Sequence, residues 1–402
     1  MPPSGSDASV DVTIAIVTRD RRDELRRALR SALEQEGAIE VLVLDDGSRD
    51  GTSEMVRDEF PGVRVARYDD NAGVAVRRND AASLARGRVI VSIDDDAVFT
   101  SPRIVADTLA DFDHPRIAAV AVPYIDVGND PAVGQQAPDA TGRWVTSIFR
   151  ATAYAIRRDV LVDLGGYDGR VDQFGEEWEL SLRMLDAGYV IRLGRADPIH
   201  HHESPKRSWR RMDINSRRNE QLISWTYFPF PWNLLSMAWY AVKGLRNGLR
   251  VRRPSAAVIG VGSGLRACVA ARHARRPISR AAFGFDRFVR SRARTGAAVT
   301  LAEAEAQLDL PGPRPKPQGG GWPGPARQLH APLRRARTTV IEKVGRPVHC
   351  EACGGLLFRG LPLVWGGRVK FLGADRVLVR ADWDKMNRMT FRHVERDLCD
   401  RS

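Results

Sequence analysis

The stretch that decides the fold is RVIVSIDDD, residues 88–96. The run VIVSI has the composition of a buried strand, and three carboxylates follow it at once. Alternate side chains of a strand share a face, so Asp94 and Asp96 can point into one cleft while Asp95 points away or into the loop. Three like charges at the end of a core strand repel each other unless a cation or a basic group compensates them. The alternative interpretation is a solvated acidic turn.

Upstream of this stretch, apolar strands alternate with helical patterns. Strands are predicted in VTIAIV (12–17), IEVLVLDDG (39–47) and VRVARYDD (63–70), and helices in residues 21–35, 51–60 and 74–87. Such alternation indicates βαβ units, an α/β fold class and a mostly parallel sheet flanked by helices. Ligands of such sheets bind at the carboxyl ends of the strands, where both Asp-rich turns fall.

Downstream, further strands and a short helix are expected in residues 118–127 and 145–168, and EEWELSLRMLDAGY (176–189) is an amphipathic helix. The sheet is expected to continue to about Arg195. A disordered tail is expected over residues 1–10.

Residues 225–242, WTYFPFPWNLLSMAWYAV, are apolar and aromatic, and Lys243 and four arginines follow by residue 253. Two prolines, an asparagine and a serine interrupt the run, which argues against a membrane-spanning helix. An interfacial segment that meets anionic lipid headgroups fits this pairing, and packing on the flank of the domain or in a dimer is the alternative.

The remaining chain divides into three predicted parts. A basic helical extension is expected over 225–310, a Pro/Gly linker over 311–329, and a small β-containing appendage of unassigned role over 330–402. Cys350 and Cys353 form a single CxxC, half of a structural zinc site, and unligated cysteines are the favoured interpretation.

The formal net charge of +12 favours an acidic partner. The basic residues are not accompanied by a zinc-finger, helix-turn-helix or RNP-type pattern, so no nucleic acid is expected. Four scattered cysteines fit a reducing compartment, and MPPSGSDASV does not resemble a secretory signal. We therefore expect a cytoplasmic protein, peripheral at the inner face of the plasma membrane if the interfacial segment binds lipid.

Several of these motifs recur in a known order. The segments 12–35, VLVLDDGSRDGT (41–52) and NAGVAVRRNDAASLARGRVIVSIDDD (71–96), followed by residues 149–169 and 174–191, together resemble the family 2 nucleotide-sugar glycosyltransferases of GT-A fold. The resemblance covers roughly residues 11–205. It implies a GT-A domain over 11–224, with a donor half at 11–102 and an acceptor half at 103–224.

The resemblance implies roles for the donor half. Thr18 and Asp46 match positions that contact the nucleotide base, Asp94 the position near the ribose and metal, and Asp96 the metal-ligating Asp. Arg78 matches a basic residue of the stretch NAGVAVRRN, here followed by Asp80 and Ala81 in place of the commoner x-Gly. A Mn2+ or Mg2+ ion would then steady the donor diphosphate.

The family's acidic pair before a helix, usually Glu-Asp, is Glu176-Glu177 here. By position Glu177 is the catalytic base that deprotonates the acceptor hydroxyl, which implies inversion at the anomeric carbon. Because Glu is longer than Asp, Glu176 is the alternative. The alternative is that Glu176, Glu177 and Glu179 are acids that suit a helix N-terminus, which would be the favoured interpretation without the Asp triplet.

The segment IHHHESP (199–205) resembles the family's histidine after the base helix, which in some members completes the metal or diphosphate site. His201 fits the spacing to Ser204 best, and His200 is nearly as good. Surface histidines are the alternative interpretation.

These residues together predict an inverting glycosyltransferase that moves a sugar from a nucleotide-diphosphate sugar to a hydroxyl acceptor, either a glycan, a lipid-linked glycan or a small molecule. A nucleotidyltransferase or sugar-nucleotide synthase is one rival, although VTRDRRDEL (17–25) lacks the glycines of its phosphate loop. A non-catalytic polyanion- or membrane-binding scaffold is the other.

Overall fold

The computed structural model describes residues 10–171, 173–203 and 208–308, together with five strands between residues 347 and 393. The chain divides into two compact units, residues 1–325 and 326–402. Three sequence predictions concern residues outside the described part of the chain. They are residues 1–9 of the predicted tail (1–10), the whole predicted linker (311–329), and Cys350 with Cys353.

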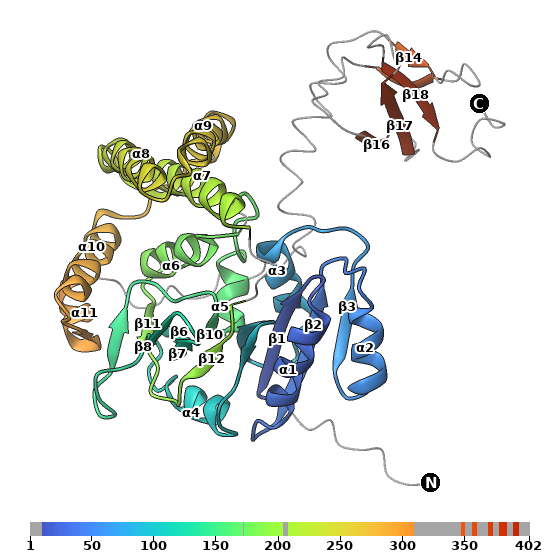
Figure 1. Cartoon of the computed structure of the whole chain (residues 1–402). Helices are drawn as coiled ribbons and strands as arrows, with labels where there is room; N and C mark the ends of the chain where they lie inside the picture. The colour runs from blue at the N-terminus through green and yellow to red at the C-terminus, as the bar shows by residue number, and fades with distance from the viewer. Residues whose placement is uncertain are drawn as a thin grey trace. The chain divides into compact units, whose positions relative to one another are not determined.

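The first unit is organised around a nine-stranded sheet with the order β13-β9-β11-β6-β10-β4-β1-β2-β3 (Figure 1). Its strands are β1 (Val12–Thr18), β2 (Ile39–Asp45), β3 (Arg64–Arg67), β4 (Val89–Asp94), β6 (Ile117–Ala121), β9 (Trp144–Thr146), β10 (Ala153–Arg157), β11 (Val190–Leu193) and β13 (Val299–Thr300). Only β9 and β10 run against the direction of the others. The expected α/β fold class with a mostly parallel sheet is confirmed.

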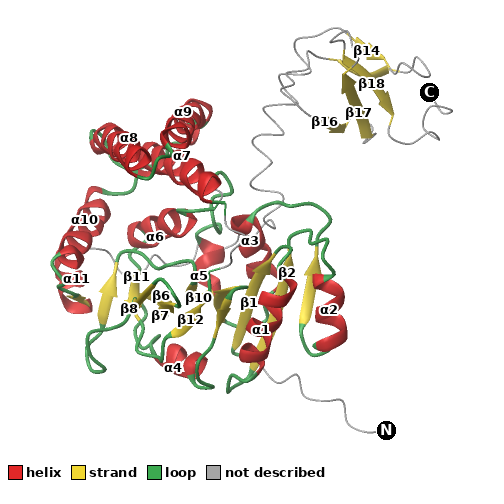
Figure 2. Cartoon of the chain, in the orientation of Figure 1, coloured by secondary structure: helices red, strands yellow, loops and turns green. Residues whose placement is uncertain are grey.

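Helices cover both faces of this sheet (Figure 2). They are α1 (Arg22–Leu33), α2 (Thr52–Glu59), α3 (Val74–Leu84), α4 (Ile104–Ala110), α5 (Arg158–Asp163) and α6 (Glu176–Asp186). Alternate residues of each strand belong to two hydrophobic cores, one on each face of the sheet. In β1, Ile14 and Ile16 pack with residues of α1, α2 and α4, whereas Ala15 packs with residues of α3 and α5. Burial on both faces explains why these strands are continuous apolar runs.

A smaller sheet crosses the carboxyl edge of the large one, with the order β5-β12-β7-β8. Its strands are β5 (Ala97–Val98), β7 (Tyr124–Asp126), β8 (Asp130–Gly134) and β12 (Ile199–His201). Strand β5 begins directly after Asp96 and pairs with β12, so His201 lies opposite Ala97. Chain segments a hundred residues apart therefore meet at the acidic triplet.

A helical part follows, with α7 (Trp209–Tyr227), α8 (Trp232–Arg250), α9 (Pro254–Ala270), the short 3-10 helix η1 (Arg272–Ala274), α10 (Arg280–Arg294) and α11 (Leu301–Leu308). The helical character thus begins at Trp209, inside the region expected to belong to the acceptor half. Among the described residues, no helix combines the length and the apolar character needed to cross a membrane.

The second unit contains two antiparallel sheets. Strands β14 (Pro347–His349) and β15 (Leu356–Arg359) form one, and β16 (Val369–Leu372), β17 (Leu378–Trp383) and β18 (Met389–His393) form the other. The C-terminal region therefore carries the β structure that its alternating segments predict.

Candidate active site

The acidic triplet lies at the carboxyl edge of the large sheet, where β4 ends at Asp94. Asp95 and Asp96 are buried and Asp94 is half-buried. Burial of three neighbouring acids is costly unless each finds compensating partners. The partners of the three side chains differ, and they divide the triplet into two groups.

Asp94, at the end of β4, and Asp96, in the turn before β5, lie beside His201 of β12. Ligand atoms of these three residues all lie within 4.8 Å of one another. The His201 Nε2 atom is 3.3 Å from an Asp96 oxygen and 4.0 Å from an Asp94 oxygen. The structure thus brings together Asp94 and Asp96, the two residues predicted to share a cleft. Strand β12 places His201 beside them.

The ring of His201 is oriented by Asp126. Strands β12 and β7 are parallel and place His201 beside Asp126, whose carboxylate lies 2.5 Å from Nδ1. A histidine that binds a metal through one nitrogen usually donates the other N–H to a carboxylate. With Nδ1 turned to Asp126, Nε2 is the ring atom that faces Asp94 and Asp96.

Two carboxylates and one imidazole suit a divalent cation such as Mn2+ or Mg2+. Burial lowers the pKa of His201, but hydrogen bonds to Asp96 and Asp126 and the charge of Asp94 outweigh this and raise it to about 9. The raised pKa reflects the negative field of the surrounding carboxylates, and the same field attracts a cation. The residues present therefore fit a metal ion.

His200 does not join this group. Neighbouring side chains of a strand point to opposite faces, so β12 cannot direct both histidines to the triplet. The ring of His200 lies instead near that of His202, with 6.3 Å between the ring centroids. The structure therefore brings His201, and not His200, to Asp94 and Asp96. Ser204, which supported His201 by spacing, lies outside the described residues.

Asp95 belongs to the second group and is firmly held. It accepts hydrogen bonds from the Thr18 hydroxyl at 2.8 Å and from Arg21 at 2.7 Å, and Arg21 also lies 3.1 Å from Asp96. Burial raises the pKa of Asp95 to about 7, although the charge of Arg21 opposes the change. Asp95 lies outside the group formed by Asp94, Asp96 and His201, and its side chain joins β1 to the triplet.

Asp46 organises the loop that precedes α3. Its carboxylate accepts hydrogen bonds from the backbone N–H groups of Ala72 and Gly73 and from Nε of Arg77 at 2.7 Å. The guanidinium of Arg77 also stacks 3.4 Å above the ring of Tyr68. The ends of β2 and β3 are therefore joined to the start of α3 by one buried ion pair.

Arg78, the neighbouring arginine, links the acidic triplet to the acidic pair of α6. It is buried, and it donates to Glu176 at 2.8 Å, to the carbonyl oxygen of Ala151 at 3.2 Å and to Asp94 at 3.4 Å. The predicted donor-half residue thus contacts both parts of the predicted reaction centre.

The two glutamates at the start of α6 have different surroundings. Glu176 is buried and its pKa is raised to about 7 by burial and by the charge of Glu177, against the effect of Arg78. Glu177 is half-buried and accepts a hydrogen bond from the backbone N–H of Gly175. The third acid of this turn, Glu179, is buried and paired with Arg183 at 2.8 Å. Of the three, Glu177 is therefore the most accessible.

Sequence reasoning missed Arg21, Arg77 and Asp126. Arg21 and Arg77 stand beside residues that the motifs single out, and the need to neutralise the triplet was a signal for a basic partner after β1. Asp126 lies in a short strand whose place depends on the pairing of β7 with β12, and local sequence pattern carries no signal for that pairing.

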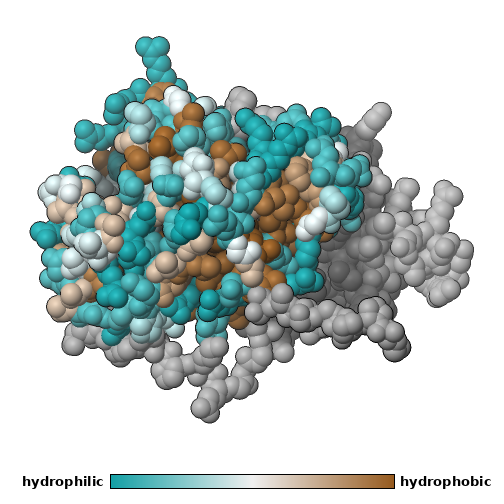
Figure 3. Space-filling view, turned by 90° about the horizontal axis from the view of Figure 1, so that it is seen from below, coloured by the Kyte–Doolittle hydropathy of each residue, from teal (hydrophilic) through white to brown (hydrophobic). Residues whose placement is uncertain are grey.

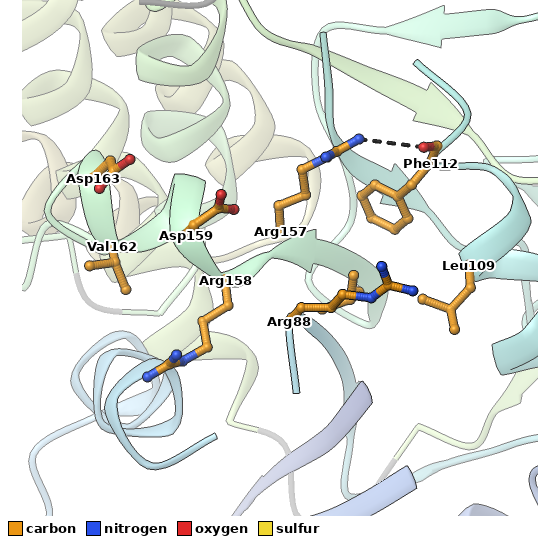
Figure 4. A pocket seen from close by; sticks show the side chains of 9 residues that line it. Arg88, Leu109, Phe112, Arg157, Arg158, Asp159, Val162 and Asp163 are labelled. Atoms are coloured by element: carbon orange, nitrogen blue, oxygen red, sulfur yellow. Dashed lines mark hydrogen bonds between the residues drawn. The ribbon is translucent and has the colours of Figure 1, made fainter. Parts of the chain in front are cut away.

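A cavity of about 630 Å³ lies elsewhere, at the opposite end of β4. It is lined by Arg88, Val89, Leu109, Phe112, Arg157, Arg158, Asp159, Val162 and Asp163 (Figure 4). Arg157 crosses it and donates to the carbonyl oxygens of Phe112, His114 and Ile117. Its position at the amino end of β4 separates it from the carboxyl edge that carries Asp94 and Asp96.

Known proteins resemble parts of this chain. Succinoglycan biosynthesis protein ExoU of Rhizobium meliloti (strain 1021) is 36% identical over 100 residues, which cover 24% of this chain and 29% of that protein. ExoO of the same strain is 38% identical over 106 residues, covering 26% and 30%. The chain thus spans less than a third of the length of these two relatives.

Among solved structures, a mannosyltransferase from Pyrobaculum calidifontis in complex with GDP-Man and Mn2+ aligns with a TM-score of 0.44 and 20% identity, over 76% of this chain and 88% of that one. At the level of sequence, residues 13–167 match the family described as Glycosyl transferase family 2. The match includes β1, β2 and the acidic triplet. This chain is therefore similar to glycosyl transferase family 2 over residues 13–167.

Proposed function

We propose that this chain is an inverting glycosyltransferase that moves a sugar from a nucleotide-diphosphate sugar to a hydroxyl acceptor. The observation that carries the proposal is the grouping of Asp94, Asp96 and His201 at the carboxyl edge of a domain similar to family 2. Carboxyl edges of such sheets are where nucleotides bind.

Asp94, Asp96 and His201 would hold the divalent cation, Mn2+ or Mg2+, with Asp126 fixing the histidine ring. When bound, the cation neutralises the negative charge that develops on the diphosphate leaving group. The buried guanidinium of Arg78, 3.4 Å from Asp94, adds fixed positive charge beside the same place.

The nucleoside would lie over the ends of β1 and β2, next to Thr18 and Asp46. Both side chains already bind within the protein, Thr18 to Asp95 and Asp46 to Arg77 and two backbone N–H groups. Thr18 and Asp46 would therefore offer the donor oxygen atoms that are already held in place. An ordered loop loses less conformational entropy when the nucleotide binds.

Glu177 is the proposed base that takes the proton of the acceptor hydroxyl as its oxygen attacks the anomeric carbon. A general base must reach the acceptor and be ionised there. Glu177 is the more accessible member of its pair, whereas Glu176 is buried and accepts a hydrogen bond from Arg78. Glu176 then acts as the anchor that joins the base turn to the donor site.

The acceptor is proposed only by class, as a hydroxyl of a glycan, a lipid-linked glycan or a small molecule. We also propose a cytoplasmic location, peripheral at the inner face of the plasma membrane. Support comes from the scarcity of cysteines and from Cys268, a buried free thiol.

The test is transfer from a panel of nucleotide-sugars with Mn2+ or Mg2+, comparing wild type, Asp96→Ala and Glu177→Ala. Loss of the cation ligand or of the base is expected to lower turnover by about 10²–10⁴-fold in each variant. Asp163→Ala, an exposed acid of α5, is the matched control and should keep full activity. Transfer that survives both Asp96→Ala and Glu177→Ala would overturn the mechanism.

A further inference from the structure

Helices α8 and α9 pack against α7 through small residues. The buried positions of α9 are Ala256, Ala257, Gly260, Gly264 and Cys268, and α8 buries Gly244 and Gly248. A Cβ atom at Gly260 would come within 2.7 Å of the Ile214 carbonyl oxygen, and one at Gly264 within 2.9 Å of the Arg218 carbonyl oxygen. The helix backbones are therefore in close contact.

The large apolar side chains of the same helices point outward. Of the seventeen large apolar side chains exposed in the described part of the chain, fourteen lie between Trp209 and Val269. On α8 and α9 they are Trp232, Leu234, Leu235, Trp239, Val242, Leu245, Leu249, Val258, Ile259, Leu265 and Val269, which we name the α8–α9 surface. Trp239, for example, is 64% exposed.

This arrangement inverts the usual pattern of a water-soluble helix, which buries large apolar residues and exposes polar ones. Small residues at helix contacts with large apolar residues outward are typical of helices surrounded by lipid. Figure 3 views the chain from the side that faces down in Figure 1, where hydrophilic residues make up most of the surface and apolar residues gather near its middle.

Positive charge borders the α8–α9 surface. Residues 209–276 contain thirteen Lys and Arg residues and two Asp and Glu residues. A hollow of about 550 Å³ between α7 and α8 is lined by Arg217, Lys243, Arg246, Asn247 and Arg250. Lys243, Arg246 and Arg250 each directly follow an outward apolar residue of α8. The basic side chains of this helix therefore lie beside its exposed apolar side chains.

We propose that the α8–α9 surface docks onto an anionic phospholipid bilayer, with lipid phosphates bound in the hollow formed by Arg217, Lys243, Arg246 and Arg250. The helices lie in the plane of the interface, with their apolar side chains inserted among the acyl chains and their basic side chains at the headgroups. Tryptophans such as Trp232 and Trp239 suit this depth. The sign and the adjacency of the charge select an anionic lipid surface over a neutral one.

The experiment is flotation of the full chain with vesicles of phosphatidylcholine alone or with about 30% phosphatidylglycerol. We expect binding to the anionic vesicles that weakens as salt rises. Lys243→Gln/Arg246→Gln/Arg250→Gln should lower partitioning about a hundredfold, since each basic residue near the surface contributes about fivefold. Leu235→Ser/Trp239→Ser removes inserted apolar side chains and should lower partitioning to both kinds of vesicle.

Control variants carry substitutions of the same kind away from the α8–α9 surface. Leu33→Ser changes a leucine that is 49% exposed, against 55% for Leu235, and Arg30→Gln/Arg57→Gln/Arg103→Gln removes three exposed charges. Both controls should bind like wild type. Thermal unfolding of each variant confirms that it is folded, and no donor or acceptor is needed, so failure here is distinct from failure of the proposed transferase activity.

Two results would overturn the proposal. One is equal flotation of wild type and both α8 variants. The other is a wild type that fails to bind anionic vesicles and is instead a dimer in solution, with Leu235→Ser/Trp239→Ser as a monomer, because a second copy would then cover the α8–α9 surface.

Discussion

The carboxyl edge of the sheet and the α8–α9 surface depart from the usual distribution of residues in opposite ways. At the edge, charged side chains such as Asp96, Arg78 and Glu176 are buried, and each is held by a partner of opposite charge. On α8 and α9, large apolar side chains are exposed while glycines and alanines are buried. Both arrangements cost stability in water unless something compensates.

The difference between the two regions lies in where that compensation is found. Buried charges at the edge are compensated within the chain, by Arg21 and Arg78 and by the polar partners of Asp46. The exposed apolar residues of α8 and α9 have no such cover from the described residues, and their compensation must come from another molecule. Substitutions should therefore damage the fold in the first region and association in the second.

The largest effect on stability is expected from Arg78→Met. The substitution leaves Glu176 and Asp94 without their buried cation, and removal of one partner of a buried ion pair costs about 3–5 kcal/mol. Urea unfolding monitored by tryptophan fluorescence measures the loss. The double variant Arg78→Met/Glu176→Gln should recover a large part of it, because the uncompensated carboxylate is gone. A loss below about 1 kcal/mol in the single variant would show that the ion pair is not essential to this edge.

A second effect concerns the pH dependence of stability. The pKa of Glu176 rises to about 7 on folding from an ordinary 4.5, so the folded state keeps a proton that the unfolded state loses between these values. Stability contributed by this group is present below pH 4.5 and falls as pH rises to about 7. From pH 5 to pH 8, the free energy of unfolding of Glu176→Gln should fall less than that of wild type, by on the order of 3 kcal/mol. Urea unfolding at both pH values measures this difference. Parallel declines in wild type and variant would refute the raised pKa.

The two regions were also unequally predictable from sequence. The order of RVIVSIDDD, NAGVAVRRN and the Glu176-Glu177 pair pointed to the strands, to Asp94 with Asp96, and to Arg78. The partners Arg21, Asp126 and Arg77 required tertiary pairings, such as that of β12 with β7, which local periodicity does not encode. For α8 and α9, the sequence shows the aromatic and basic composition. It does not predict that the glycines face inward, because a glycine within a helical pattern ordinarily indicates a less stable helix.

The smallest expected effect tests that glycine packing directly. Gly260→Ala would place a methyl group 2.7 Å from the Ile214 carbonyl oxygen, so α9 must shift away from α7, at a cost of about 1–3 kcal/mol. Gly262, two residues along the same helix, has no atom within 4 Å of an added Cβ, and Gly262→Ala should stabilise the helix by up to about 1 kcal/mol. Thermal unfolding of the two variants against wild type measures both signs. Equal melting temperatures for the two variants would mean that α9 does not pack closely on α7 in solution. The close packing would then no longer explain why the large apolar side chains of α9 face outward. Melting temperatures that change in opposite directions in the two variants would show that the exposed apolar face belongs to a rigid, closely packed group of three helices. Such rigidity is needed if this face is to insert into a bilayer surface without unfolding.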